Sequence, residues 1–195
     1  MYQFRWDRLP KATVTLVAAN VLYFLYLSVF GSSLDTGFMI EKGALYAPLV
    51  LERQEFYRLF TAMFMHFGLE HIFFNMLLLY FLGDIIEREM GVTIFLFSYF
   101  VTGLCGNVAS LLYYAVSPGH VVSAGASGAI FGLVGMIAYM VYCNRGYFRG
   151  ISSRQIILMV AFSLYSGFTG SDVNNISHVV GLIAGVLCGM IFYRE

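Results

Sequence analysis

The chain has 195 residues, of which 59% are hydrophobic and 11% are charged, and its 11 basic residues balance its 11 acidic ones. Soluble domains carry about 25% charged residues, so this composition indicates a protein whose solvent is lipid. The net charge is zero and no basic run could follow a nucleic-acid backbone, which excludes nucleic-acid binding. The three cysteines stand in apolar stretches without disulfide or zinc spacing, which predicts small core residues (Cys105, Cys143, Cys188).

Six apolar segments are long enough to be read as membrane helices. They are residues 12–30, 70–87, 92–115, 127–143, 155–168 and 176–193. The first follows a basic start but lacks a cleavage site of small residues, so we expect a retained helix rather than a signal peptide. The long connection 31–57 alternates apolar with charged residues and is expected to pack partly into the membrane interface. Without repeats or linkers, residues 1–195 are expected to form a single membrane domain with no soluble domain appended.

Six spans place both ends of the chain on one side of the membrane. The basic residues that fall on that side are Arg5, Arg8, Lys11, Arg88, Arg145, Arg149, Arg154 and Arg194. They are most of the basic residues in the chain. By the positive-inside rule both termini are therefore predicted to be cytoplasmic, in a multi-pass integral membrane protein.

Polar groups at membrane depth are costly and mark candidate functional sites. His71 and Asn75 stand at the start of the second span, Ser127 at the start of the fourth and His178 near the start of the sixth. Even-numbered spans all begin at the outer face, so topology alone places these residues at similar depth. His71 and Asn75 are four residues apart, which puts both side chains on one helix face.

Two rows of glycine suggest which spans approach each other. Gly128, Gly132 and Gly135 lie on the fourth span, and Gly181, Gly185 and Gly189 lie on the sixth. This spacing lets helix backbones meet closely. If the rows face each other, Ser127 and His178 come within reach as a nucleophile and its base. Backbone N–H groups at a helix start could then hold an oxyanion, with Asn75 and His71 adding donors. The simpler reading is helix packing, with Ser127 as a helix N-cap.

Several motifs occur in a fixed order between about residues 50 and 190. They are Tyr57-Arg58 followed by Thr61; His66, His71 and Asn75 in H-x(4)-H-x-x-x-N; Gly83, Glu87 and Gly91; Gly125-Ala126-Ser127-Gly128; and Asn175, His178 and Gly181 in N-x-x-H-x-x-G. Together they resemble the rhomboid family of intramembrane serine proteases. Tyr57 departs from the Trp that the family more often has. The chain is also expected to lack the additional soluble domain or seventh helix of some relatives.

The resemblance implies an all-α membrane protein, a six-transmembrane-helix rhomboid-like bundle. It implies a catalytic dyad of Ser127 as nucleophile and His178 as general base and acid. The oxyanion hole would be formed by the Ser127 N–H, Asn75 and His71. The supporting residues would be His66, Phe131, Gly125, Gly128, Asn175 and Gly181. Phe131 stands where an aromatic residue, often Tyr, stacks on the catalytic imidazole, and its position one turn after Ser127 makes that contact possible.

The activity so implied is cleavage of transmembrane protein substrates within the lipid bilayer near its outer face, in a bacterial cell membrane, with no metal and no cofactor. Three alternatives stay open. Glu70 or Asp172 could complete a triad. His66, His71, His120 and His178 could handle a metal or protons, although no H-E-x-x-H motif is present. The chain could also be a non-catalytic rhomboid-like chaperone, against which the intact Ser127 and His178 count.

The fifth span, 155–168, is predicted to be the shortest and to end in a glycine-rich stretch, 166–171, beside the loop that leads to His178. A short helix with glycines at its outer end has few contacts to lose on opening. We therefore expect this span and its loop to form a movable gate for substrate, with Phe168 as a plug.

Overall fold

The structure is a computed structural model that describes residues 9–116, 121–169 and 174–194, with the backbone alone for residues 166–169. The helices are α1 (Lys11–Phe30), α2 (Thr36–Lys42), α3 (Ala47–Glu52), α4 (Arg58–Thr61), the 3-10 helix η1 (Ala62–Phe64), α5 (Gly68–Val116), α6 (Ser127–Cys143), α7 (Ser153–Thr169) and α8 (Asn175–Phe192). Four two-residue strands form two antiparallel pairs. They are β1 (Leu45–Tyr46) with β2 (Val122–Ser123), and β3 (Tyr147–Phe148) with β4 (Ile151–Ser152).

Every predicted apolar segment lies on a helix. Helix α5 covers the second and third, and its path turns at Gly91, whose φ of 83° is non-helical. Three helices, α1, α5 and α8, are long and apolar enough to cross a membrane, while α6 and α7 are apolar but shorter. The prediction that the fifth span is the shortest is wrong, because α7 and α6 both have 17 residues. The helix continues through Gly167, which the sequence suggested as part of a terminating stretch.

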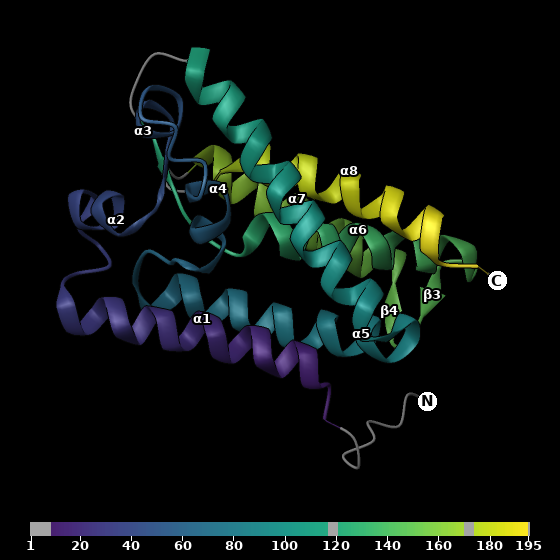
Figure 1. Ribbon diagram of the computed structural model, residues 1–195. Helices are drawn as coiled ribbons and strands as arrows, with labels where there is room; N and C mark the ends of the chain where they lie inside the picture. The colour runs from purple at the N-terminus through teal and green to yellow at the C-terminus, as the bar shows by residue number, and fades with distance from the viewer. Residues whose placement is uncertain (1–8, 117–120, 170–173, 195) are drawn as a thin grey trace.

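The two ends of the bundle differ in what they carry (Figure 1). Helices α5, α6 and α8 all begin at the end where α2, α3 and α4 lie. The start of α1, the Gly91 turn, the β3–β4 hairpin and the end of α8 lie at the opposite end. The starts of three helices, and hence the predicted site, therefore share one end of the molecule.

Helices α6 and α8 pack backbone to backbone. A side-chain carbon at Gly181 would overlap the carbonyl oxygen of Gly128, and one at Gly185 would overlap that of Gly132. A carbon at Gly135 would in turn overlap the carbonyl oxygen of Leu182. The two glycine rows thus face each other, as the sequence predicted, and only residues without side chains permit so close an approach.

Helix α1 is fixed at its start by a carboxylate from α5. Pro10 precedes the helix and provides no side-chain cap. The buried Glu87 instead accepts hydrogen bonds from the N–H groups of Ala12 and Thr13, at 3.1 and 2.7 Å, and from the Thr13 hydroxyl at 2.7 Å. Gly83, one turn earlier, leaves room for Thr13 against α5. The motif of Gly83 and Glu87 therefore joins α1 to α5.

The connection between α1 and α5 is folded around Arg58. This buried guanidinium donates to the carbonyl oxygens of Ile40 and Ala44, at 2.6 and 3.0 Å, and to the Glu55 carboxylate at 2.7 Å. Two small apolar clusters stabilise the connection, one around Leu45 and one around Met39. Outward-facing apolar side chains remain on it (Leu34, Leu51, Phe56, Tyr57, Phe60), a surface that fits a membrane interface.

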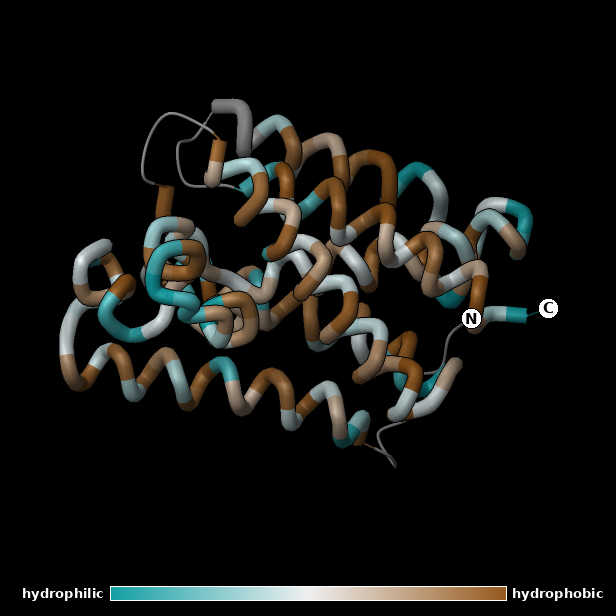
Figure 2. The backbone as a smooth tube through the Cα atoms, turned by 45° about the horizontal axis from the view of Figure 1, so that its top comes forward, coloured by the Kyte–Doolittle hydropathy of each residue, from teal (hydrophilic) through white to brown (hydrophobic). Residues whose placement is uncertain are grey.

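Apolar side chains also cover the outside of the helices. Figure 2 shows hydrophobic residues all along them, with the most hydrophilic stretches gathered mainly toward the two ends of the bundle. Exposed examples from different helices are Leu25, Phe73, Phe97, Phe162 and Leu187. So large an apolar surface on a folded chain indicates contact with lipid.

Candidate active site

The turn that leads into Ser127 is held by hydrogen bonds to Ala62 of η1 and to His66, which follows η1. The Gly125 N–H donates to the Ala62 carbonyl oxygen at 2.9 Å, and the Ala126 N–H donates to His66 Nε2 at 3.4 Å. Just upstream, β2 pairs with β1. Gly125 has a φ of 142°, a conformation that favours glycine. These contacts fix the backbone that enters α6 at Ser127.

Ser127 is the first residue of α6, and Ala126 occupies the capping position without a side-chain capping bond. The simpler reading of Ser127 as an N-cap is therefore wrong. Ser127 is partly exposed as a residue, while the next four residues are buried. A nucleophile at this position would lie beside the unpaired N–H groups of the first helical turn.

His178 lies in the first turn of α8 and is 5% exposed. Its ring stacks on that of Phe131, with a centroid separation of 4.2 Å and an interplanar angle of 5°. Phe131 is one helical turn beyond Ser127 on α6, and Gly181, one turn beyond His178, touches Gly128. Contacts on both helices thus bring the segments of Ser127 and His178 together. Nδ1 of His178 is buried without a hydrogen-bond partner in the part of the chain that the structure describes.

His71 and Ser127 border the same space above Gly125. A side-chain carbon at Gly125 would lie 3.0 Å from His71 Nε2 and 3.5 Å from Ser127 Oγ. Only glycine therefore fits between the hydroxyl and the imidazole without crowding the His71 ring. Asn75 is buried one turn further along α5, and its side-chain amide donates to the His71 carbonyl oxygen at 2.9 Å.

His66 is fully buried before the start of α5, with its ring centroid 5.1 Å from that of His71. Burial, with a smaller contribution from the nearby His71, lowers the pKa of His66 to about 3. A neutral His66 ring can accept the Ala126 hydrogen bond. His66 therefore supports the turn before Ser127.

Asn174 joins three parts of the site. It caps α8 by accepting a hydrogen bond from the Ser177 N–H at 3.0 Å, and its amide donates to the hydroxyls of Ser110 and Ser123, at 2.8 and 2.9 Å. Ser177 packs against the glycines of neighbouring helices, including Gly128. The sequence does not indicate Ser110 or Ser123, because Asn174 lies far from both along the chain.

Other predicted residues are placed as follows. Asn175 donates to the Leu164 carbonyl oxygen of α7 at 3.2 Å, so it lies at the junction of α7 and α8. Glu70 is exposed in the first turn of α5. His120 and Asp172 lie outside the described residues. Within the described ranges, no group of three or more His, Cys, Asp or Glu side chains could hold a metal ion.

The rhomboid domain family model matches residues 53–195. The chain is 36% identical over 176 residues to rhomboid protease GluP of Bacillus subtilis, which covers 90% of this chain and 34% of that protein. It is 34% identical to the putative rhomboid protease YdcA of the same organism, over 72% of this chain and 69% of the relative. It is 33% identical to RHOMBOID-like protein 1 of Arabidopsis thaliana, over 78% of this chain and 39% of the relative.

The helices with apolar outer surfaces and the polar site at one end define an integral membrane protein. The chain belongs to the rhomboid family. It spans about a third of the length of GluP and more than two thirds of YdcA.

Proposed function

We propose that the protein is a serine endopeptidase that cleaves transmembrane protein substrates within the bilayer. The observation that carries the proposal is the His178 ring stacked on Phe131, one turn from Ser127, across the glycine contact of α6 and α8. The rhomboid proteases among the relatives support the same class of activity.

In the proposed mechanism His178 takes the proton of the Ser127 hydroxyl while Oγ attacks the scissile carbonyl carbon. The oxyanion forms beside Gly125, where the His71 imidazole and the first N–H groups of α6 can donate hydrogen bonds to it. Asn75 is close by on α5. As the C–N bond breaks, His178 returns the proton to the leaving amine. Water then hydrolyses the acyl-enzyme with His178 again as base. Within the described residues Nδ1 of His178 has no hydrogen-bond partner, so the proposal assigns a dyad; Asp172, a carboxylate considered for a triad, lies outside them.

The test is cleavage of a model transmembrane substrate by the purified protein in liposomes. Ser127→Ala and His178→Ala should each reduce turnover to background, because nucleophile and base act as one unit. Ser127→Ala should also leave the melting temperature close to wild type. Ser28→Ala on α1, a serine whose hydroxyl donates to the Phe24 carbonyl oxygen of its own helix, is the matched control and should be fully active. Turnover by Ser127→Ala would refute the nucleophile. Substrate binding without cleavage by the wild-type protein would support the chaperone alternative.

The six-span topology and its orientation belong to the same proposal. Helices α1, α6, α7 and α8 and the two arms of α5 would each cross the membrane, with the β3–β4 end in the cytoplasm and Ser127 near the outer face. Single cysteines introduced at Gln54 and at Gly150, in a cysteine-free background, test this in intact cells. A membrane-impermeant thiol reagent should label the first and not the second, and the reverse pattern would invert the orientation.

Helix α7 remains our candidate for the movable gate. Its side chains are largely exposed, and Ile156 near its start is its buried residue within 153–165. An engineered disulfide between the outer end of α7 and the start of α5, which holds the second predicted span, should suppress cleavage, and reduction should restore it. Full activity of the oxidised protein would refute the gate.

A further inference from the structure

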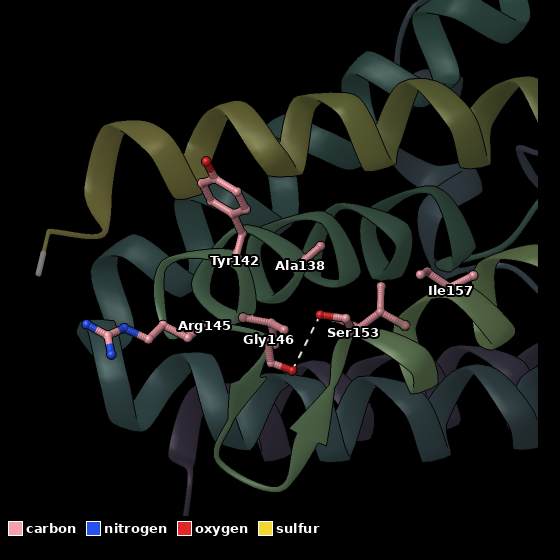
Figure 3. Close-up of a pocket in the computed structure, with 8 residues that line it drawn as sticks. Ala138, Tyr142, Arg145, Gly146, Ser153 and Ile157 are labelled. Atoms are coloured by element: carbon pink, nitrogen blue, oxygen red, sulfur yellow. Dashed lines mark hydrogen bonds between the residues drawn. The ribbon is translucent and has the colours of Figure 1, made fainter.

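A groove of about 430 Å³ lies between α6 and α7, at the opposite end of α6 from Ser127 (Figure 3). Its lining residues are Ala138, Val141, Tyr142, Arg145, Gly146, Ser153, Ile156 and Ile157. The volume falls within the roughly 300–1,000 Å³ typical of small-molecule sites. Tyr142 is 79% and Ile157 is 65% exposed, so the groove opens sideways toward the surrounding lipid. The proposed protease reaction makes no use of it.

The lining changes character along the groove. Toward the C-terminal end of α6, Ala138 and Val141 come first, and Arg145 and Gly146 follow the helix. Ser153 begins α7, and the isoleucines follow it. The two helices are joined by the β3–β4 hairpin, so the end of α6 and the start of α7 lie at the same level. One end of the groove is therefore apolar and the other is polar. Figure 3 shows the Arg145 side chain extending past the end of α6, away from Ile157.

Arg145 is the arginine that lines the groove, and it lies at the same end of the bundle as Arg88 and Arg149. Arg88 pairs with Asp84, and Arg149 pairs with Glu89. Among the described residues, no carboxylate pairs with Arg145, which is exposed. A cation without a partner, at the rim of an apolar groove at the end of a helix, is complementary to a phosphate that carries an acyl chain.

We propose that this groove binds an anionic phospholipid, with an acyl chain along Ala138, Ile156 and Ile157 and the headgroup phosphate at Arg145. The tyrosine at the rim suits the headgroup level of a membrane. The proposal is independent of the protease reaction, because its residues lie at the other end of α6.

Native mass spectrometry of the full chain in detergent, with equal amounts of dioleoyl phosphatidylglycerol and phosphatidylcholine, tests the headgroup contact. A single basic residue near the membrane surface predicts an about fivefold preference for phosphatidylglycerol. Arg145→Asn should bring the ratio close to one; asparagine tolerates the φ of 56° at this position. Arg53→Asn removes the same charge at the opposite end of the molecule and should keep the preference. Equal retention of both lipids by the wild type, or an unchanged ratio in Arg145→Asn, would overturn the proposal.

The apolar contact has its own matched pair of variants. Ala138→Trp should fill the groove and remove bound phosphatidylglycerol, whereas Ala18→Trp on the exposed face of α1 should not. Melting curves verify that both variants are folded, and Ile157→Trp provides a second filling variant should Ala138→Trp unfold. Inorganic phosphate in excess should leave the lipid in place, because it makes no acyl contact. Displacement by phosphate, or a dimer that Ala138→Trp abolishes, would overturn the assignment to lipid.

Discussion

Helices α7 and α8 both pack against α6, but in opposite ways. Between α6 and α8 the backbones touch, and a side chain at Gly185 or Gly181 would overlap a carbonyl group of α6. Along α7, Ile157, Leu158 and Tyr165 are each more than half exposed. Near the site, α7 is joined to α8 by the hydrogen bond from Asn175 to the Leu164 carbonyl oxygen.

The difference shows how one bundle can fix the relative position of two side chains and still leave a neighbouring helix loosely packed. Ser127 and His178 lie on the pair of helices that cannot slide without steric overlap, so their relative position is fixed by the backbone. Under the proposed function, a substrate helix would still have to reach them from the lipid. Within residues 153–165, helix α7 buries Ile156 alone, fewer residues than α1, α5, α6 or α8, so we expect it to be the apolar helix that moves at the lowest free-energy cost.

The largest effect should come from breaking the tight pair. Gly185→Val places a branched side chain against the Gly132 backbone and is expected to cost about 3 kcal/mol or more in stability and to remove cleavage. Ala184→Val on the adjacent, half-exposed position should leave both close to wild type. Thermal melting and turnover measure the outcome. A fully active Gly185→Val protein would show that α6 and α8 need not touch.

The next effect concerns the oxyanion rather than the packing. Asn75→Ala should lower kcat by about 10²–10³, the usual loss for one oxyanion donor. Asn144→Ala at the end of α6 is the control, because Asn144 also donates to the carbonyl oxygen four residues before it and lies far from Ser127. A loss confined to KM, with kcat unchanged, would contradict the oxyanion role of Asn75.

A smaller effect should follow from separating the two tasks of Asn174. Asn174→Ala loses the cap of α8 and both serine contacts, which predicts a loss of about 1 kcal/mol in stability and about tenfold in kcat. Asn174→Asp keeps an acceptor for the Ser177 N–H but not the amide that donates to Ser110 and Ser123. It should recover the melting temperature but not kcat. If Asn174→Asp restored both the melting temperature and kcat, Asn174 would act as a helix cap alone.

Some of these features could be read from the sequence because they are local. The bounds of α6 agree with the predicted 127–143, and the glycine rows followed from a four-residue spacing. The Phe131 contact with His178 was expected from the position of Phe131 one turn after Ser127, aided by the family resemblance.

Other features depend on partners that only the folded chain brings together. Glu87 caps a helix whose start is 75 residues away, and Asn174 bonds to Ser110 across 64 residues. The two-residue strands β1 and β2 are too short for any alternation of side chains to predict them. The predicted span 155–168 falls short of α7 by two residues at its start and one at its end, because Ser153 and Arg154 begin the helix without being apolar.

The smallest effect is expected on α7 itself, and it tests the comparison most directly. Leu158→Ala on α7 and Leu133→Ala on α6 remove the same atoms, but Leu158 is 58% exposed and Leu133 is fully buried. Leu133→Ala should cost about 2–5 kcal/mol, because it leaves a cavity between packed helices. Leu158→Ala should change stability by less than about 0.5 kcal/mol, because lipid replaces the lost contacts. Unfolding of both variants in the same detergent measures the two values side by side. Equal destabilisation would mean that α7 is as tightly held as α6, and the gate would then need another helix.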